Sequence, residues 1–281
     1  MIDAKLQDEL RYKFNPEGSV LRRAQETMLS LLVFLDSVCR ENNLSYWLDG
    51  GTLLGAVRHG GFIPWDDDTD VCMQRKDAML LMDILGNKIH EGHIVLQNRK
   101  TEKNYPNSSW MTLRDTESRY IQDSYAHNRL KFQGLQLDIF IMEEGIPSYI
   151  KRFGSLLHNV LITSPLSNSH HIGFLRPLVN LNHRILDRIT YPLLRKFKNN
   201  KRILNYGIGS PFSITYPAEI VFPLKELSFE NKLFFCPNKP EDYLRIEYGN
   251  WEEIPSFENI GSHNAQIQFL NNGGCVREIG K

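Results

Sequence analysis

Hydrophobic positions between residues 20 and 41 recur every three or four residues, which predicts a long amphipathic helix. The apolar positions are Val20, Leu21, Ala24, Met28, Leu31, Leu32, Leu35, Val38 and Cys39. The pair Asn42-Asn43 is expected to end the helix. A helix with one apolar face needs a partner surface, so we expect it to cover one face of a β-sheet.

Shorter apolar patterns predict strands and helices along the rest of the chain. Strands are expected at 45–48, 68–73, 94–97, 109–113, 119–122 and 135–141, and helices at about 53–59, 76–90 and 240–248. Short strands are expected from residue 231 onward, and residues 271–274 are expected to be loosely ordered. This order predicts an α/β or α+β core with a mixed sheet, and we adopt α+β. We divide the chain into a catalytic core (1–145), a basic helical insertion (146–215) and a C-terminal segment packing back on the core (216–281).

Composition places the chain among ordinary globular proteins. It has 281 residues, 41% hydrophobic and 23% charged, with no net charge. No stretch reaches the roughly 18 apolar residues of a spanning helix, and the charged N-terminus is not typical of a signal peptide, so we expect a cytoplasmic protein. Its four cysteines have neither Cys-x-x-Cys nor zinc spacing, which predicts buried thiols without a disulfide or structural zinc.

Positive charge is concentrated in residues 151–202, which hold ten Lys or Arg residues and one acidic residue, Asp187. Apolar residues lie between the charges. Basic amphipathic helices can contact an anionic membrane surface, here the inner face of the membrane, or a phosphorylated glycan carrier. A helical insertion whose charges face water is an equal alternative. Nucleic-acid binding is disfavoured because aromatic residues do not interleave with the charge.

A glycine-rich turn followed by four aspartates in five residues is the strongest chemical signal. Gly50-Gly51 lets the backbone approach a ligand, and Thr52 is expected to cap the following helix. If 68–73 is a strand, Asp68 and Asp70 lie on one face about 7 Å apart and can bind Mg²⁺ or Mn²⁺. A solvated acidic loop is the plain alternative. An EF-hand is disfavoured because the loop lacks its glycine and its final glutamate.

These residues resemble a known family. The stretch GTLLGAVRHGGFIPWDDD (51–68) is similar to the LicD/fukutin branch of the nucleotidyltransferase superfamily, as are GLQLDIF (134–140) and the block at 222–251. The resemblance implies that Asp68, Asp70 and Asp138 bind the metal, and alternation along 135–139 also places Asp138 on a polar face. Thr69 and Ile141 depart from the family pattern without removing a metal ligand.

The resemblance also implies an activity. LicD-like proteins transfer phosphocholine, or a related phospho-alcohol, from a CDP-activated donor such as CDP-choline to a sugar hydroxyl of a cell-surface glycan or its lipid-linked precursor. Two other functions stay open: nucleotidyl transfer proper, which would use the same three carboxylates, and a non-catalytic glycan- or metal-binding module. Three converging carboxylates disfavour the module.

The remaining candidates have less defined roles. Gly51 and Thr52 are expected to contact the donor phosphates. Arg58 and His59 either orient the diphosphate or brace the turn. Asp67 is a candidate general base, although bracing the loop is the commoner role, and His59 is the rival base. Five aromatic residues near the motifs could contact a cationic headgroup, but each is more commonly a core residue: Tyr46, Trp47, Trp65, Tyr105 and Trp110.

Overall fold

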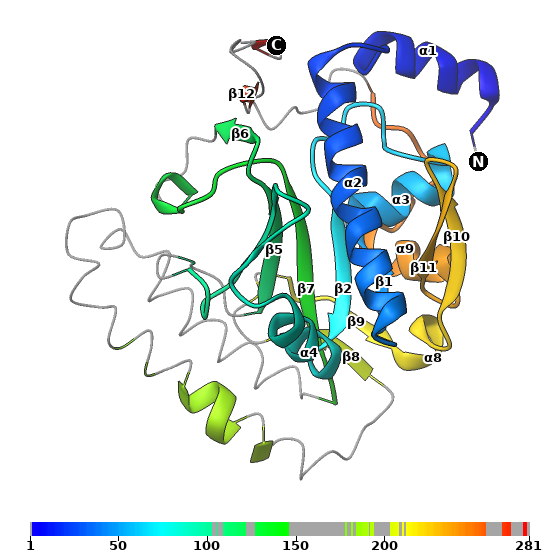
Figure 1. Cartoon of the computed structure of the whole chain (residues 1–281). Coiled ribbons are helices and arrows are strands. Elements are labelled where there is room, and N and C mark those ends of the chain that lie inside the picture. The colour runs from blue at the N-terminus through cyan, green and yellow to red at the C-terminus, as the bar shows by residue number, and fades with distance from the viewer. Residues whose placement is uncertain are drawn as a thin grey trace.

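The structure is a computed structural model (Figure 1). It describes residues 2–102, 105, 109–121, 127–145, 178, 181, 184–190, 192–193, 203–207, 210, 212–256, 266–270 and 278–279.

A mixed sheet of eight strands forms the centre of the molecule. Its main path runs β1-β2-β7-β5-β4-β3, while β8 pairs with the end of β7 and β9 pairs with β8. The strands are β1 (Tyr46–Leu48), β2 (Asp70–Gln74), β3 (Ile89–His90), β4 (Ile94–Gln97), β5 (Trp110–Asp115), β7 (Gln136–Glu144), β8 (Ile203–Tyr206) and β9 (Thr215–Pro217). Strands β2 and β7 are parallel, and the other paired strands of the sheet are antiparallel. The predicted α+β class is confirmed.

The described part of the chain also contains helices. They are α1 (Ala4–Phe14), α2 (Val20–Glu41), α3 (Gly50–His59), α4 (Arg75–Leu85), α8 (Ala218–Val221) and α9 (Pro240–Tyr248), with shorter helical turns at His127–Arg129 and Leu186–Thr190. Of these helices, α2, α3, α4 and α8 contact this sheet. The predicted long helix is confirmed as α2. The Ser19 hydroxyl caps it by accepting a hydrogen bond from the Arg22 amide at 3.1 Å.

The two faces of the sheet differ in chemistry. Alternation places Val71 of β2 and Ile139 of β7 on one face, and Asp70 and Asp138, which are register partners, on the other. The apolar face packs against α2 and α4, and the buried side chains of these elements form one core cluster. The opposite face carries the acidic residues.

Several predicted boundaries were wrong, and two of them bear on the sheet edge and on the acidic loop. The helix predicted to run from residue 76 to about 90 ends at Leu85, because Gly86 follows with φ +58° and residues 89–90 form strand β3. The strand predicted to start at Asp68 starts at Asp70, so Asp68 belongs to the preceding loop.

C-terminal elements flank the β1 edge of the sheet. The hairpin of β10 (Lys225–Phe229) and β11 (Lys232–Cys236) lies against β1, and α9 packs on α3 and α8. A small sheet joins β6 (Ser118–Ile121), β12 (Gln266–Phe269) and β13 (Glu278–Ile279). Cys39, Cys72 and Cys236 are buried free thiols.

The basic segment lies mostly outside the described residues, as do Asn271–Gly274 and Cys275. Within the segment, Arg184 and Arg188 are exposed. Among the described residues, none of the helices combines the length and the apolar character that crossing a bilayer requires.

Candidate active site

The chain passes from β1 to α3 through a turn that brings backbone against carboxylates. Gly50 has φ +51°, and a Cβ placed on it would lie 3.1 Å from Asp70 Oδ2. A Cβ on Gly51 would lie 2.7 Å from Asp66 Oδ2, closer than such contacts allow. The glycines therefore permit the N-terminus of α3 to lie beside the acidic loop, where its free amides can receive an anion.

Four aspartates gather at this turn from two neighbouring strands and a loop. The β2–β7 register pairs Asp70 with Asp138. Asp66 and Asp68 come from the loop before β2 and line the same cavity as Asp70. The Asp138 carboxylate accepts hydrogen bonds from Thr112 Oγ1 at 2.6 Å and Gln136 Nε2 at 3.0 Å, which fix its orientation.

Burial and mutual repulsion oppose ionisation of these groups. Burial first, and then the charges of Asp68 and Asp138, raise the pKa of Asp70 well above its ordinary value. Burial first, and then Asp68, raise the pKa of Asp66 in the same direction. Burial raises the pKa of Asp138 to about 6, although the hydrogen bond from Thr112 opposes the shift. A cation placed among them would relieve both effects.

The donor set fits a hard divalent cation by its chemistry, since it consists of carboxylate oxygens. In the part of the chain that the structure describes, however, no three His, Cys, Asp or Glu side chains stand at the spacing that one ion requires. Binding of Mg²⁺ or Mn²⁺ would therefore draw the carboxylates together, against a repulsion that the ion itself removes.

Thr52 does not cap α3, so that prediction was wrong. The N-cap residue is Asp49, and the buried Thr52 hydroxyl instead accepts a hydrogen bond from the Asp70 amide at 2.8 Å. Thr52 thus fixes the start of β2, whereas Gly51 lines the cavity.

Asp67 lies between two cavity residues but is not among those that line the cavity. Tyr120 donates its hydroxyl proton to Asp67 Oδ2 at 2.9 Å. This bond ties the acidic loop to β6.

Arg58 and His59 are buried at the C-terminal end of α3. Arg58 Nη1 donates to the carbonyl oxygens of Trp251 and Glu253 at 2.9 and 3.0 Å, and Arg58 also lines the cavity. Arg58 Nε donates to His59 Nε2 at 2.9 Å, so His59 Nδ1 carries the proton and donates to Gln7 at 2.7 Å. Burial and then the Arg58 charge lower the pKa of His59 to about 3. Both ring nitrogens of His59 are therefore bonded to protein groups.

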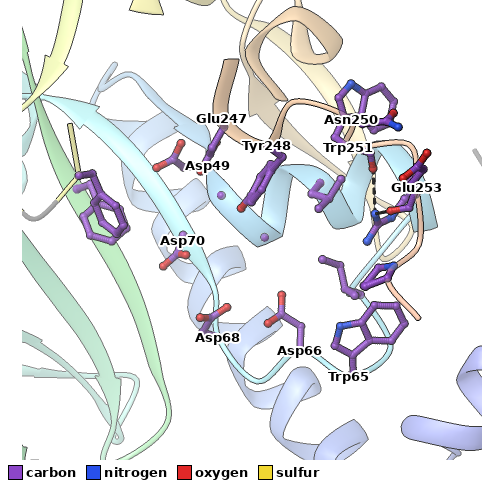
Figure 2. A pocket seen from close by; sticks show the side chains of 18 of the residues that line it. Asp49, Trp65, Asp66, Asp68, Asp70, Glu247, Tyr248, Asn250, Trp251 and Glu253 are labelled. Carbon is purple, nitrogen blue, oxygen red and sulfur yellow. Dashed lines mark hydrogen bonds between the residues drawn. The ribbon is translucent and has the colours of Figure 1, made fainter. Parts of the chain in front are cut away.

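A cavity of about 510 Å³ lies over the turn and the acidic loop. Figure 2 shows Asp66, Asp68 and Asp70 on one side and Glu247 and Tyr248 on the other. Its lining comprises Asp49, Gly50, Gly51, Leu54, Arg58, Ile63, Trp65, Asp66, Asp68, Asp70, Phe140, Tyr206, Phe212, Glu247, Tyr248, Asn250, Trp251, Glu253 and Pro255. Residues far apart in the sequence therefore share one cavity.

Asp49 connects these distant parts. Its buried carboxylate accepts hydrogen bonds from Tyr243 at 2.5 Å, Tyr206 at 2.8 Å and the Cys72 thiol at 3.0 Å. Burial raises the pKa of Asp49, and the three donors oppose that shift. The same residue follows β1 and occupies the N-cap position of α3, so its side-chain bonds join the glycine turn to β2, β8 and α9.

Sequence reasoning missed Asp49 and the cavity residues of the C-terminal segment. The block at 222–251 carried a family resemblance, but spacing alone attached no chemistry to Glu247 or Tyr248. Of the five aromatics considered for a headgroup, Trp65 lines the cavity, whereas Tyr46, Trp47 and Tyr105 are buried elsewhere and Trp110 packs on Phe140.

Comparisons with known proteins agree with this geometry. Residues 43–146 match the family described as LicD/FKTN/FKRP, nucleotidyltransferase domain. The chain is 26% identical over 268 residues to the Haemophilus influenzae lipopolysaccharide cholinephosphotransferase LicD, covering 89% of this chain and 98% of that protein. It is 42% identical over 58 residues to human ribitol 5-phosphate transferase FKRP, covering 21% of this chain and 11% of FKRP. Over residues 43–146, the chain is therefore similar to the nucleotidyltransferase domain of the LicD/FKTN/FKRP family.

Proposed function

We propose that this protein transfers phosphocholine, or a related phospho-alcohol, from a CDP-activated donor to a sugar hydroxyl of a cell-surface glycan or its lipid-linked precursor, releasing CMP. The observation that carries the proposal is the β2–β7 register, which sets Asp70 beside Asp138 at the glycine turn. The names of the relatives support transfer of a phospho-alcohol, and LicD is named for phosphocholine and lipopolysaccharide.

Asp68, Asp70 and Asp138 are the proposed ligands of Mg²⁺, or Mn²⁺. A bound divalent ion would polarise the phosphate and offset the charge of the leaving group. Gly51 and the first amides of α3 contact the donor phosphates. Thr52 assists by holding the amide of Asp70, and Arg58, the cation of the cavity lining, orients the diphosphate.

Asp67 is the proposed proton acceptor for the attacking hydroxyl, with Tyr120 holding its carboxylate. Asp67→Asn keeps the shape and the bond from Tyr120 but removes the base. We expect a rate reduced by at least about a hundredfold at unchanged donor affinity, measured by CMP release. Wild-type turnover in this variant would assign Asp67 to the loop brace instead.

We place the reaction in the cytoplasm at the inner face of the membrane, where a lipid-linked glycan acceptor would be presented. The support is the excess of basic residues in 151–202. Sedimentation with anionic vesicles tests this location, and a protein that stays in the supernatant with both anionic and neutral vesicles contradicts it.

Calorimetric titration tests the activity directly. CDP-choline, CDP-ethanolamine, CDP-glycerol and CDP-ribitol are titrated with Mg²⁺ and with EDTA, against wild type and the double variant Asp68→Ala/Asp70→Ala. The matched control is Asp83→Ala, an exposed carboxylate on α4. We expect metal-dependent binding that only the double variant loses.

Product analysis then separates the competing functions. Release of CMP with transfer of the phospho-alcohol supports the proposal. Transfer of the nucleotide itself would indicate nucleotidyl transfer, and tight binding without turnover would indicate a binding module.

A further inference from the structure

The cavity has an aromatic corner formed by Phe140, Tyr206 and Phe212, all of which line it. The three rings contact one another, with centroids 5.8 Å apart for Phe140 and Tyr206, 5.2 Å for Phe140 and Phe212, and 5.1 Å for Tyr206 and Phe212. Phe212 is 41% exposed, so the corner presents an open ring. None of these rings was a candidate from the sequence.

Two carboxylates outside the proposed metal set adjoin the aromatic corner. Tyr206 donates to Asp49, and Glu247 lines the same cavity, where its carboxylate accepts a bond from Tyr216 at 3.3 Å. Asp49 and Glu247 are both carboxylate side chains that line this part of the cavity, where a bound cation would offset their negative charge.

The cavity's positive charge lies at its other end. Of the described residues that line the cavity, Arg58 alone is a Lys or Arg residue. Its guanidinium donates hydrogen bonds to the backbone carbonyls of Trp251 and Glu253. Arg58 follows Gly50 by eight positions along α3, which is a rise of about 12 Å. An ammonium group is repelled at the Arg58 end and attracted at the aromatic corner.

We infer that the aromatic corner, together with Asp49 and Glu247, is the headgroup site of the donor and selects a cationic alkylammonium over a neutral polyol. This inference rests on the proposed function. The diphosphate extends from the glycine turn toward Arg58, and the nucleoside lies toward Trp65. Ring faces attract a cation, whereas a polyol needs hydrogen-bond partners that ring faces do not supply. The comparisons leave this choice open, because the relatives include both a cholinephosphotransferase and a ribitol 5-phosphate transferase.

Titrations with three ligands and Mg²⁺ test the inference: CDP-choline, CDP-glycerol and CMP. Wild type is expected to bind CDP-choline about tenfold more tightly than CDP-glycerol, an effect of the size of a partly desolvated cation–π contact. Phe212→Ala should weaken CDP-choline about tenfold and change CDP-glycerol and CMP less than twofold. Phe132→Ala, a half-buried phenylalanine that does not line the cavity, is the matched control and should change none of the three.

Glu247→Gln provides a second variant that leaves the rings in place. It should also reduce the preference for CDP-choline, and CMP affinity should stay constant. A wild type that prefers CDP-glycerol, or variants that weaken all three ligands equally, would overturn the headgroup assignment while metal-dependent CMP binding still supports the proposed function. If no CDP compound binds in the presence of Mg²⁺, the proposed function fails and the headgroup assignment fails with it.

Discussion

The two faces of the central sheet have opposite energetics. On the face toward α2, Ile139 of β7 and Leu35 of α2 are buried in one apolar cluster, which stabilises the fold. The face toward the cavity holds Asp70, Asp138 and Asp49, whose burial and proximity destabilise their charged forms. One sheet thus combines an apolar layer that stabilises the fold with an acidic layer whose ionisation costs stability.

Asp70→Asn should show the largest difference between the two faces, because it should reduce activity without reducing stability. We expect transfer activity to fall by roughly a thousandfold, because a proposed metal ligand is lost. Without metal, the free energy of unfolding at pH 7 should stay the same or rise. The folded protein raises the pKa of Asp70, so Asp70 lowers the protein's stability as the pH rises above the pKa of the unfolded state. Asparagine does not ionise and removes this effect. Turnover and urea unfolding measure the two effects, with Asp83→Asn as the exposed control. A large loss of stability would show that Asp70 supports the fold.

Leu35→Ala makes the complementary change on the apolar face. Leu35 is fully buried in the core cluster, so the free energy of unfolding should fall by about 2–5 kcal/mol. Leu80→Ala on α4, where Leu80 is 44% exposed, should change it by less than about 0.5 kcal/mol. Donor affinity of the folded protein should be the same in both variants. A weakened donor affinity in Leu35→Ala alone would show that the two faces are coupled.

Tyr243→Phe tests the connection that Asp49 makes. It removes the 2.5 Å hydrogen bond to Asp49 Oδ1 and leaves a buried carboxylate oxygen with one donor fewer, at an expected cost of about 1–3 kcal/mol in unfolding free energy. Tyr12→Phe, at an 83% exposed tyrosine, is the control. Chemical denaturation provides the measurement. An unchanged midpoint for Tyr243→Phe would show that the hydrogen bond between Tyr243 and Asp49 does not stabilise the fold.

His59→Gln should have the smallest effect, and only in acid. The folded pKa of His59, about 3, lies below its ordinary value of 6.5, so its contribution to stability is present above pH 6.5 and is lost as the pH falls toward 3. Protonation would break the bond from Arg58 Nε and place two cations together. Urea midpoints between pH 7 and 4 should fall more steeply for wild type than for His59→Gln. Parallel curves would contradict this assignment.

Sequence reasoning succeeded where one local pattern determines the structure. The three- and four-residue spacing predicted α2, and alternation predicted that Asp138 lies on a polar face. It failed at Thr52, because the glycine turn begins α3 earlier and leaves the threonine to bond with Asp70. It missed Asp49 and Glu247 because their surroundings come from distant segments. Tyr206 and Tyr243 contact Asp49 across 157 and 194 residues, and no spacing rule spans such separations.

The bonds of Asp49 also set an order in time. During synthesis, the glycine turn and the acidic loop leave the ribosome long before Tyr243, which follows Asp49 by 194 residues. Until α9 has been made, the aspartates have no opposite wall, and Glu247 and Tyr248 cannot enclose a ligand. A nascent chain therefore contains the glycine turn and the aspartates before it contains the opposite wall of the cavity. The complete cavity forms only after α9 has been synthesised.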